Sequence, residues 1–166
     1  MSVDTDISQP LREAVTSAAA SRTALAIAGG GTKTFYTGTP HGKPFAVSGH
    51  RGIVSYEPTE LVVTARAGTP LAEIESALST KRQMLGFEPP WFGAAATLGG
   101  TIACGFSGPR RPYAGSARDF VLGTKIINGK GEILKFGGEV MKNVAGYDIS
   151  RLMVGALGTL GVLLEV

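Results

Sequence analysis

Two glycine-rich stretches about 65 residues apart hold the residue types best suited to binding an anion. The first runs from Ala28 to Thr34, and the second contains Thr97-Leu98-Gly99-Gly100. Glycine lets a ligand approach backbone N–H groups closely, and such groups at the start of a helix attract negative charge. Hydroxyl groups that can donate to phosphate lie in both stretches, on Thr32 and Thr34 and on Thr97 and Thr101. We therefore expect the two loops to bind one anionic ligand, such as a pyrophosphate, from two sides.

Neither common nucleotide-binding motif is present. The dinucleotide fingerprint needs a glycine where Thr34 stands. The P-loop pattern fails as well, because Pro44 follows Gly42-Lys43 and Gly131 follows Gly129-Lys130. The ligand would therefore be bound by another fold, through N–H groups and a helix dipole more than through many cations.

Composition limits the classes of protein that fit. The 166 residues are 43% apolar and 17% charged, with a net charge of +3. Basic residues are scattered apart from Arg110-Arg111, which argues against a nucleic-acid surface. A single cysteine excludes a disulfide framework and a multi-cysteine metal site, and we predict no metal. Without a signal peptide or an apolar run of 18 residues, the protein should be cytoplasmic, and membrane-peripheral only through partner subunits.

Hydrophobic periodicity predicts the elements that position the first loop. We expect a helix over about residues 8–23, a buried strand at 25–28 that opens into the triple glycine, and an irregular segment at 34–44. Strands follow at 45–48, 53–56 and 61–67. Thr69 and Pro70 predict the start of a helix that ends near Gln83. This order indicates a small lobe of βαβ type.

The second half is predicted to be α+β with antiparallel pairing. The glycine pair of the second stretch should open a helix. Strands are expected at 120–122, 124–127 and 133–136, with Asn128-Gly129 as a hairpin turn. Asp148 should cap a further helix, and residues 160–166 read as a buried strand. Because a domain seldom ends on a bare apolar strand, we expect a fragment of a longer chain.

The two stretches and three later motifs resemble the FAD-binding domain of the vanillyl-alcohol oxidase/p-cresol methylhydroxylase family. The later motifs are residues 113–123, 128–131 and 158–162, and all lie in the family's order within residues 20–166. The resemblance implies an α+β, two-lobed PCMH-type FAD-binding domain, truncated at its C-terminus. A small βαβ lobe would cover about residues 1–88 and a lobe with a mixed or antiparallel sheet about 89–166, and the substrate-capping domain would be absent.

Four further segments resemble the FAD-binding E subunits of bacterial glycolate oxidases: residues 50–54, 58–70, 108–112 and 136–148. This resemblance implies an FAD-dependent oxidoreductase acting on CH–OH groups, which oxidises glycolate, a 2-hydroxy acid, to glyoxylate. It also implies a second FAD-containing subunit and an iron–sulfur subunit as partners. Two alternatives stay open: a non-catalytic interaction subunit with a vestigial flavin site, and the FAD domain of a lactate-type dehydrogenase.

The resemblance also implies roles for single positions. Gly29 to Thr34 and Thr97 to Gly100 would bind the pyrophosphate, and Gly161 and Val162 would meet the adenine or ribose. Members with covalent FAD carry a histidine where Thr32 stands, so we predict non-covalent FAD; no catalytic residue is predicted. The expected cofactor-binding residues are Ala28, Gly29, Gly30, Gly31, Thr32, Lys33, Thr34, Pro90, Thr97, Leu98, Gly99, Gly100, Gly161 and Val162, with Ala103, Cys104 and Ser116 along the flavin.

Overall fold

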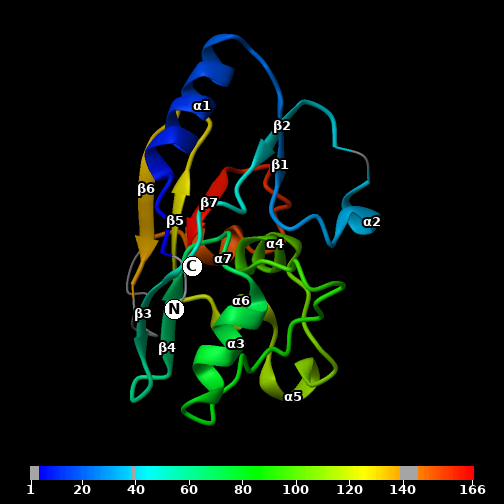
Figure 1. The fold of residues 1–166 in the computed structure, drawn as a ribbon, viewed down its shortest axis with the longest axis vertical. Coiled ribbons are helices and arrows are strands. Elements are labelled where there is room, and N and C mark those ends of the chain that lie inside the picture. Colours follow the sequence, from blue (N-terminus) through cyan, green and yellow to red (C-terminus); the bar gives the residue numbers. More distant parts are fainter. Residues whose placement is uncertain (1–3, 39, 139–145) are drawn as a thin grey trace.

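The computed structural model describes residues 4–38, 40–138 and 146–166, so part of the 136–148 motif lies outside the described residues. The helices are α1 (Ser8–Ala20), α2 (Thr34–Thr37), α3 (Leu71–Ser79), α4 (Leu98–Cys104), α5 (Arg111–Ala114), α6 (Ala117–Phe120) and α7 (Ile149–Leu152). The strands are β1 (Leu25–Ala28), β2 (Lys43–Ala46), β3 (Ile53–Glu57), β4 (Val62–Ala65), β5 (Gly123–Ile127), β6 (Ile133–Gly137) and β7 (Val162–Glu165). The predicted α+β class is confirmed (Figure 1).

Strand β7 joins the two hairpins of the molecule. It pairs antiparallel with β5, which pairs antiparallel with β6. On its other side, β7 bonds to the end of β4: Ala65 N donates to Val166 O at 2.9 Å, and Val166 N donates to Ala65 O at 3.0 Å. Strand β4 pairs antiparallel with β3. The strand that is last in sequence therefore lies between β5 and β4, near the middle of the fold (Figure 1).

Both faces of β7 are covered, and its residues alternate accordingly. Val162 and Leu164 belong to an apolar cluster that includes Leu11 of α1. Leu163 belongs to a second cluster, which includes Ile102 of α4. Successive strand residues point to opposite faces of a sheet, so burial on both faces explains the uninterrupted apolar run of this strand.

The two clusters each contain residues from before and after position 88. The division into lobes at about 1–88 and 89–166 stays a prediction. Strands β1 and β2 form a separate parallel pair, connected by the first glycine loop and α2. Parallel strands need a crossover connection, so this unit has the predicted βαβ character. The segment 34–44, expected to be irregular, contains α2 and the start of β2.

Three local predictions are wrong. Thr69 does not cap α3, because its buried hydroxyl accepts from Gly52 N at 2.9 Å and donates to Gly52 O at 3.1 Å. Helix α3 ends at Ser79, short of Gln83. The strand expected at residues 120–122 is absent, since Phe120 is the last residue of α6, Val121 follows as its C-cap, and β5 begins only at Gly123.

The predicted caps and turn of the second half are confirmed. The Asn128 carboxamide oxygen accepts from Lys130 N at 2.9 Å and Glu132 N at 3.0 Å, which fixes the turn between β5 and β6. The Asp148 carboxylate accepts from Arg151 N at 2.9 Å at the start of α7. Both are short side chains that satisfy nearby backbone donors.

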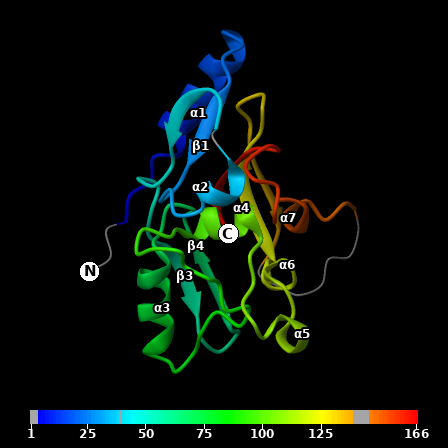
Figure 2. The same cartoon turned by 90° about the vertical axis from the view of Figure 1, so that its right-hand side faces the viewer.

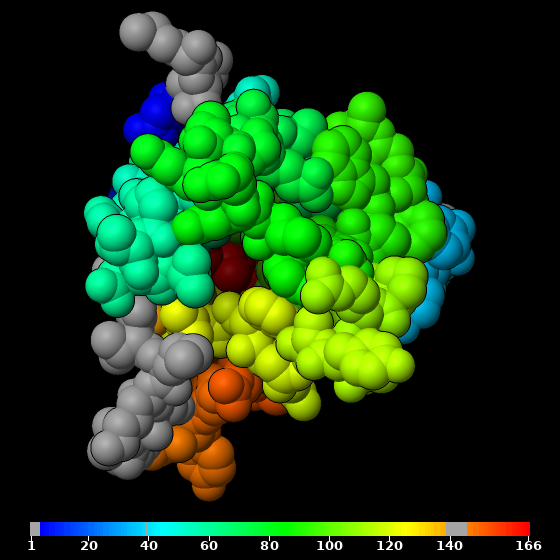
Figure 3. Space-filling view, turned by 90° about the horizontal axis from the view of Figure 1, so that it is seen from below, coloured from blue at the N-terminus to red at the C-terminus, as the bar shows by residue number. Residues whose placement is uncertain are grey.

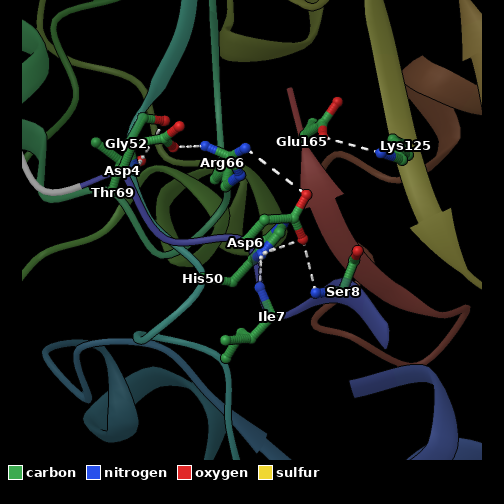
Figure 4. Close-up of polar contacts among 10 residues, drawn as sticks. All are labelled: Asp4, Asp6, Ile7, Ser8, His50, Gly52, Arg66, Thr69, Lys125 and Glu165. Atoms are coloured by element: carbon green, nitrogen blue, oxygen red, sulfur yellow. Dashed lines mark hydrogen bonds and ion pairs between the residues drawn. The ribbon is translucent and has the colours of Figure 1, made fainter. Parts of the chain in front are cut away.

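A polar cluster holds the N-terminal segment against the end of β4 (Figure 4). The Arg66 guanidinium pairs with the carboxylates of Asp4 and Asp6. His50 is fully buried, and its Nδ1 accepts a hydrogen bond from Ile7 N at 3.2 Å. Burial lowers the pKa of His50, an effect that nearby Asp6 partly opposes, so the neutral imidazole is favoured. Neutral His50 can accept the bond from Ile7 because one of its ring nitrogens carries no proton.

A cavity of about 360 Å³ opens at the lower end of the molecule, where Figure 3 shows a hollow with the C-terminal end of the chain at its floor. Its walls come from β4, the end of α3 and the loop that follows, residues 120–122, and β5. Leu98 and Ile102 line it on the side of α4. Among the described residues, no helix is both long and apolar enough to span a membrane.

Candidate functional site

The two glycine stretches touch each other; that they bind one ligand from two sides stays a prediction. A Cβ added to Gly30 would lie 1.5 Å from Ala95 O, and one added to Gly29 would lie 2.5 Å from Thr97 Oγ1. These positions therefore need glycine so that the backbone of the first loop can rest on the second stretch. The contact places the end of β1, α2 and α4 around one region of the surface (Figure 2).

The first loop presents free hydrogen-bond donors. Within the part of the chain that the structure describes, the amide groups from Gly29 to Lys33 donate to no backbone or side-chain acceptor. Gly31 has φ +69°, and nothing lies within 4 Å of a Cβ built on it. Consecutive N–H groups in a left-handed turn form a concave anion site. The loop therefore keeps the donor groups that a diphosphate needs.

The start of α4 in the second stretch lacks such free donors, so the prediction of an open helix N-terminus is wrong for the amides of Leu98 to Gly100. Thr97, whose hydroxyl was expected to donate to phosphate, caps α4, and its Oγ1 accepts from Gly100 N at 3.3 Å. Leu98 N, however, donates to Thr69 O at 2.9 Å, and Gly99 N donates to Ala67 O at 2.7 Å. The first amides of the helix are thus satisfied by the segment that follows β4. Contact of Thr97 to Gly100 with a cofactor stays a prediction, and it would have to use other atoms.

Lys33 is the charged side chain at this site. It is only 6% exposed, and its Nζ lies 3.4 Å from both Thr32 Oγ1 and Thr101 Oγ1. No carboxylate of the described residues lies within 4 Å of it. Burial lowers the pKa of Lys33, which nearby Cys104 partly opposes. Burial also raises the pKa of the Cys104 thiol, so Cys104 has little thiolate character here.

The other predicted residues lie in separate segments of the fold. Ala103 O accepts from Leu157 N at 2.9 Å, which ties the end of α4 to the segment before β7. In that segment, Gly161 has φ +156°, and a Cβ on it would lie 2.8 Å from Ile127 O. Ser116 starts α6 and donates to Asp119. Pro90 is half-buried, and neither it nor Ser116 has a recorded hydrogen bond to the first loop. FAD contact at all of these positions stays a prediction.

Sequence reasoning missed an aromatic group beside the loop. Phe35 and Tyr36 of α2 meet Phe92 and Phe106, with ring centroids 5.0 Å apart for Phe35 and Phe92 and 4.7 Å apart for Tyr36 and Phe106. Phe92 and Phe106 are also in contact, at 5.5 Å. The adjacent pair Phe35-Tyr36 in a segment expected to be irregular was the available signal. These four rings pack α2 against residues on either side of α4 in the sequence. The packing holds α2, which directly follows the first glycine loop, in place.

Comparison with known proteins agrees with this geometry. The model of a family described as "FAD binding domain" matches residues 7–137. The chain is 59% identical over 161 residues to glycolate oxidase subunit GlcE of Escherichia coli, covering 97% of this chain and 46% of that protein. It is 34% identical over 114 residues to D-2-hydroxyglutarate dehydrogenase of Xanthomonas citri pv. viticola, covering 68% of this chain and 24% of that protein. The chain thus spans less than half the length of these relatives.

A solved structure supports the fold. An alkyldihydroxyacetonephosphate synthase matches 93% of this chain and 28% of its own, with a TM-score of 0.75 at 20% identity. At that identity the likeness concerns the fold alone. The family match, in contrast, covers most of the chain and includes the first glycine loop, α4 and the hairpin β5–β6. On that ground, the chain belongs to the family of FAD-binding domains.

Proposed function

We propose that this chain is the FAD-binding part of a 2-hydroxy-acid oxidase whose substrate is glycolate. The observation that carries the proposal is the run of free amide groups from Gly29 to Lys33 beside the buried ammonium of Lys33. These groups fit a diphosphate, which offers several acceptor oxygens and two negative charges. The similarity to the Escherichia coli glycolate oxidase subunit supports glycolate over other 2-hydroxy acids. Fold alone would not support a choice of substrate.

The residues of this chain would bind and orient the cofactor. The amides from Gly29 to Lys33 would donate to the diphosphate, and the glycines at 29 and 30 would keep the loop seated on Ala95 and Thr97. Thr32 carries a hydroxyl that forms no covalent flavin link, so the FAD is held non-covalently. When bound, FAD supplies the acceptor for the hydride that leaves the substrate carbon, while the protein supplies binding and electronics.

We also propose that the chain works with partner subunits. The matching protein of Escherichia coli is named as a subunit, and a second subunit, GlcD of Bacillus subtilis, is 43% identical over 70 residues, 42% of this chain and 15% of that protein. A second FAD-containing subunit and an iron–sulfur subunit would take the electrons onward. The complex would be cytoplasmic and reach a membrane surface only through these partners.

The test is an FAD titration with a matched pair of loop variants. Asp and Asn tolerate the left-handed conformation of Gly31 and have nearly the same size, but only Asp brings a negative charge to the diphosphate. We expect Gly31→Asp to raise the Kd for FAD at least tenfold above that of Gly31→Asn, measured by quenching of FAD fluorescence. Gly129→Asp, at an open glycine in the turn between β5 and β6, should leave the Kd within twofold of the wild type.

The substrate is tested on the full-length subunit assembled with its partners. Reduction of a dye should be faster with glycolate than with D-lactate or D-2-hydroxyglutarate, and should fall in the Gly31→Asp complex. An assembled complex that binds no FAD on this subunit would overturn the proposal in favour of an interaction subunit with a vestigial flavin site. A clear preference for D-lactate would instead favour the lactate-type alternative.

A further inference from the structure

We propose that the Lys33 ammonium is the counter-ion of the FAD diphosphate, kept in the fold at a cost to the ligand-free protein. This inference rests on the proposed function and adds to it the residue that supplies the positive charge. It assigns Lys33 a role in binding, and no role in holding the fold together.

The first step is the missing counter-charge. Lys33 is 6% exposed, yet its hydrogen-bond partners among the described residues are the two hydroxyl oxygens of Thr32 and Thr101, each at 3.4 Å. Neutral hydroxyls solvate an ammonium weakly at that distance. Acidic side chains are absent within 4 Å among the described residues.

The second step is energetic. Lysine is almost never buried without a partner, because removing an ammonium from water is expensive. The lowered pKa of Lys33, caused mainly by burial, is in keeping with that cost. A buried charge that the fold leaves uncompensated destabilises the protein, and an arriving anion removes the penalty. Binding of an anion beside Lys33 would therefore explain why its ammonium is buried without a carboxylate partner.

The third step identifies the anion. Lys33 is the last residue of the segment whose five amides have no acceptor, so the charge and the neutral donors come from one short loop. Donors of both kinds at one site fit a group with many acceptor oxygens and more than one negative charge. A diphosphate has both properties, whereas the oxidised flavin ring system carries no charge.

The test compares Lys33→Met with the wild type, and uses Lys81→Met at an exposed lysine as the matched control. For Lys33→Met, we expect the Kd for FAD to rise at least tenfold and its dependence on salt to weaken. Without ligand, the melting temperature should rise by about 2–4 °C, because an unpaired buried charge is replaced by an apolar chain of similar length. ADP, which carries the diphosphate and no flavin, should raise the melting temperature of the wild type but not that of Lys33→Met.

Several results would overturn the inference. One is FAD binding by Lys33→Met within twofold of the wild type. Another is a lower melting temperature of ligand-free Lys33→Met, which would mean that Lys33 holds the fold. A third is a wild-type protein that binds FAD but is not stabilised by ADP. A wild-type full-length subunit that binds no FAD would be a different failure, that of the proposed function itself.

Discussion

Two buried cations of this molecule have opposite surroundings. Arg66, at the end of β4, is 9% exposed and pairs with the carboxylates of Asp4 and Asp6 (Figure 4). Lys33, after β1, is 6% exposed and meets two hydroxyls. The chain supplies the counter-ions of Arg66 from its own N-terminal segment, and among the described residues it supplies none for Lys33.

The difference separates two uses of a buried charge. The ion pairs of Arg66 with Asp4 and Asp6 fasten one segment to another within the protein itself, although the buried Nε of Arg66 has no hydrogen-bond partner in the described part of the chain. Lys33, in contrast, has no acidic counter-ion among the described residues. It belongs to the loop whose amide groups, from Gly29 to Lys33, have no acceptor among these residues. A buried ammonium without an acidic counter-ion, in a loop with free amide donors, fits a site that an anionic ligand completes.

The largest effect is expected from a variant that displaces the loop carrying Lys33. Gly30→Ala should destabilise the protein by about 3 kcal/mol, because the added Cβ would meet the backbone oxygen of Ala95, which cannot move aside easily. Urea unfolding followed by circular dichroism measures this change. Gly31→Ala is the control, and its left-handed backbone should cost about 1 kcal/mol. Equal losses in the two variants would contradict the packing of the loop on Ala95.

Loss of the charge at Arg66 should destabilise the protein, whereas loss of the charge at Lys33 should stabilise it. Arg66→Met should lower the free energy of unfolding by about 2 kcal/mol, the range for losing charged hydrogen bonds at a buried group. The loss stays moderate because the side chains of Asp4 and Asp6 are 65% and 46% exposed and can be solvated instead. Urea unfolding, with Arg22→Met at an exposed arginine as control, measures it. A stabilising effect at Arg66 would remove the contrast between the two cations.

His50 sharpens the comparison, because it is a buried base beside Arg66 that the fold keeps neutral. Burial lowers its pKa more than Asp6 and Glu165 raise it, and Lys125 lowers it further. Below the ordinary pKa of about 6.5, the unfolded chain then binds more protons than the folded chain, so stability falls as the pH drops. Urea unfolding at pH 7.5, 6.5 and 5.5 should show this decline, and it should be smaller in His50→Asn. Identical pH profiles would exclude His50 as its source.

Local signals in the sequence predicted much of this fold. The helix at α1, the strand at β1, the hairpin at Asn128 and the cap at Asp148 depend on near neighbours, and all were found. The sequence also predicted that the two glycine stretches serve one ligand, and the structure shows that they lie against each other. The sequence could not predict that the amides of Leu98 and Gly99 are occupied, because their acceptors, Thr69 and Ala67, come from another part of the chain.

The burial of Lys33 was beyond prediction for a related reason. Lysine in a glycine loop is ordinarily exposed, and no periodicity applies to a loop that would reveal an inward side chain. Its environment is made by Thr101, which is 68 positions away along the chain. Thr69 was misassigned in the same way, since its partner Gly52 is 17 positions away.

The position of β7 has a consequence for how the molecule forms. The hairpins β3–β4 and β5–β6 are local in sequence, but the strand that hydrogen-bonds to both, β7, follows them in the chain. During synthesis, each hairpin can form while its neighbour along the sheet is still missing. Pairing between distant segments is slow because a long loop must close first. Closure of the sheet is therefore a late event, and until it occurs the edges of β4 and β5 are available for mispairing with other chains.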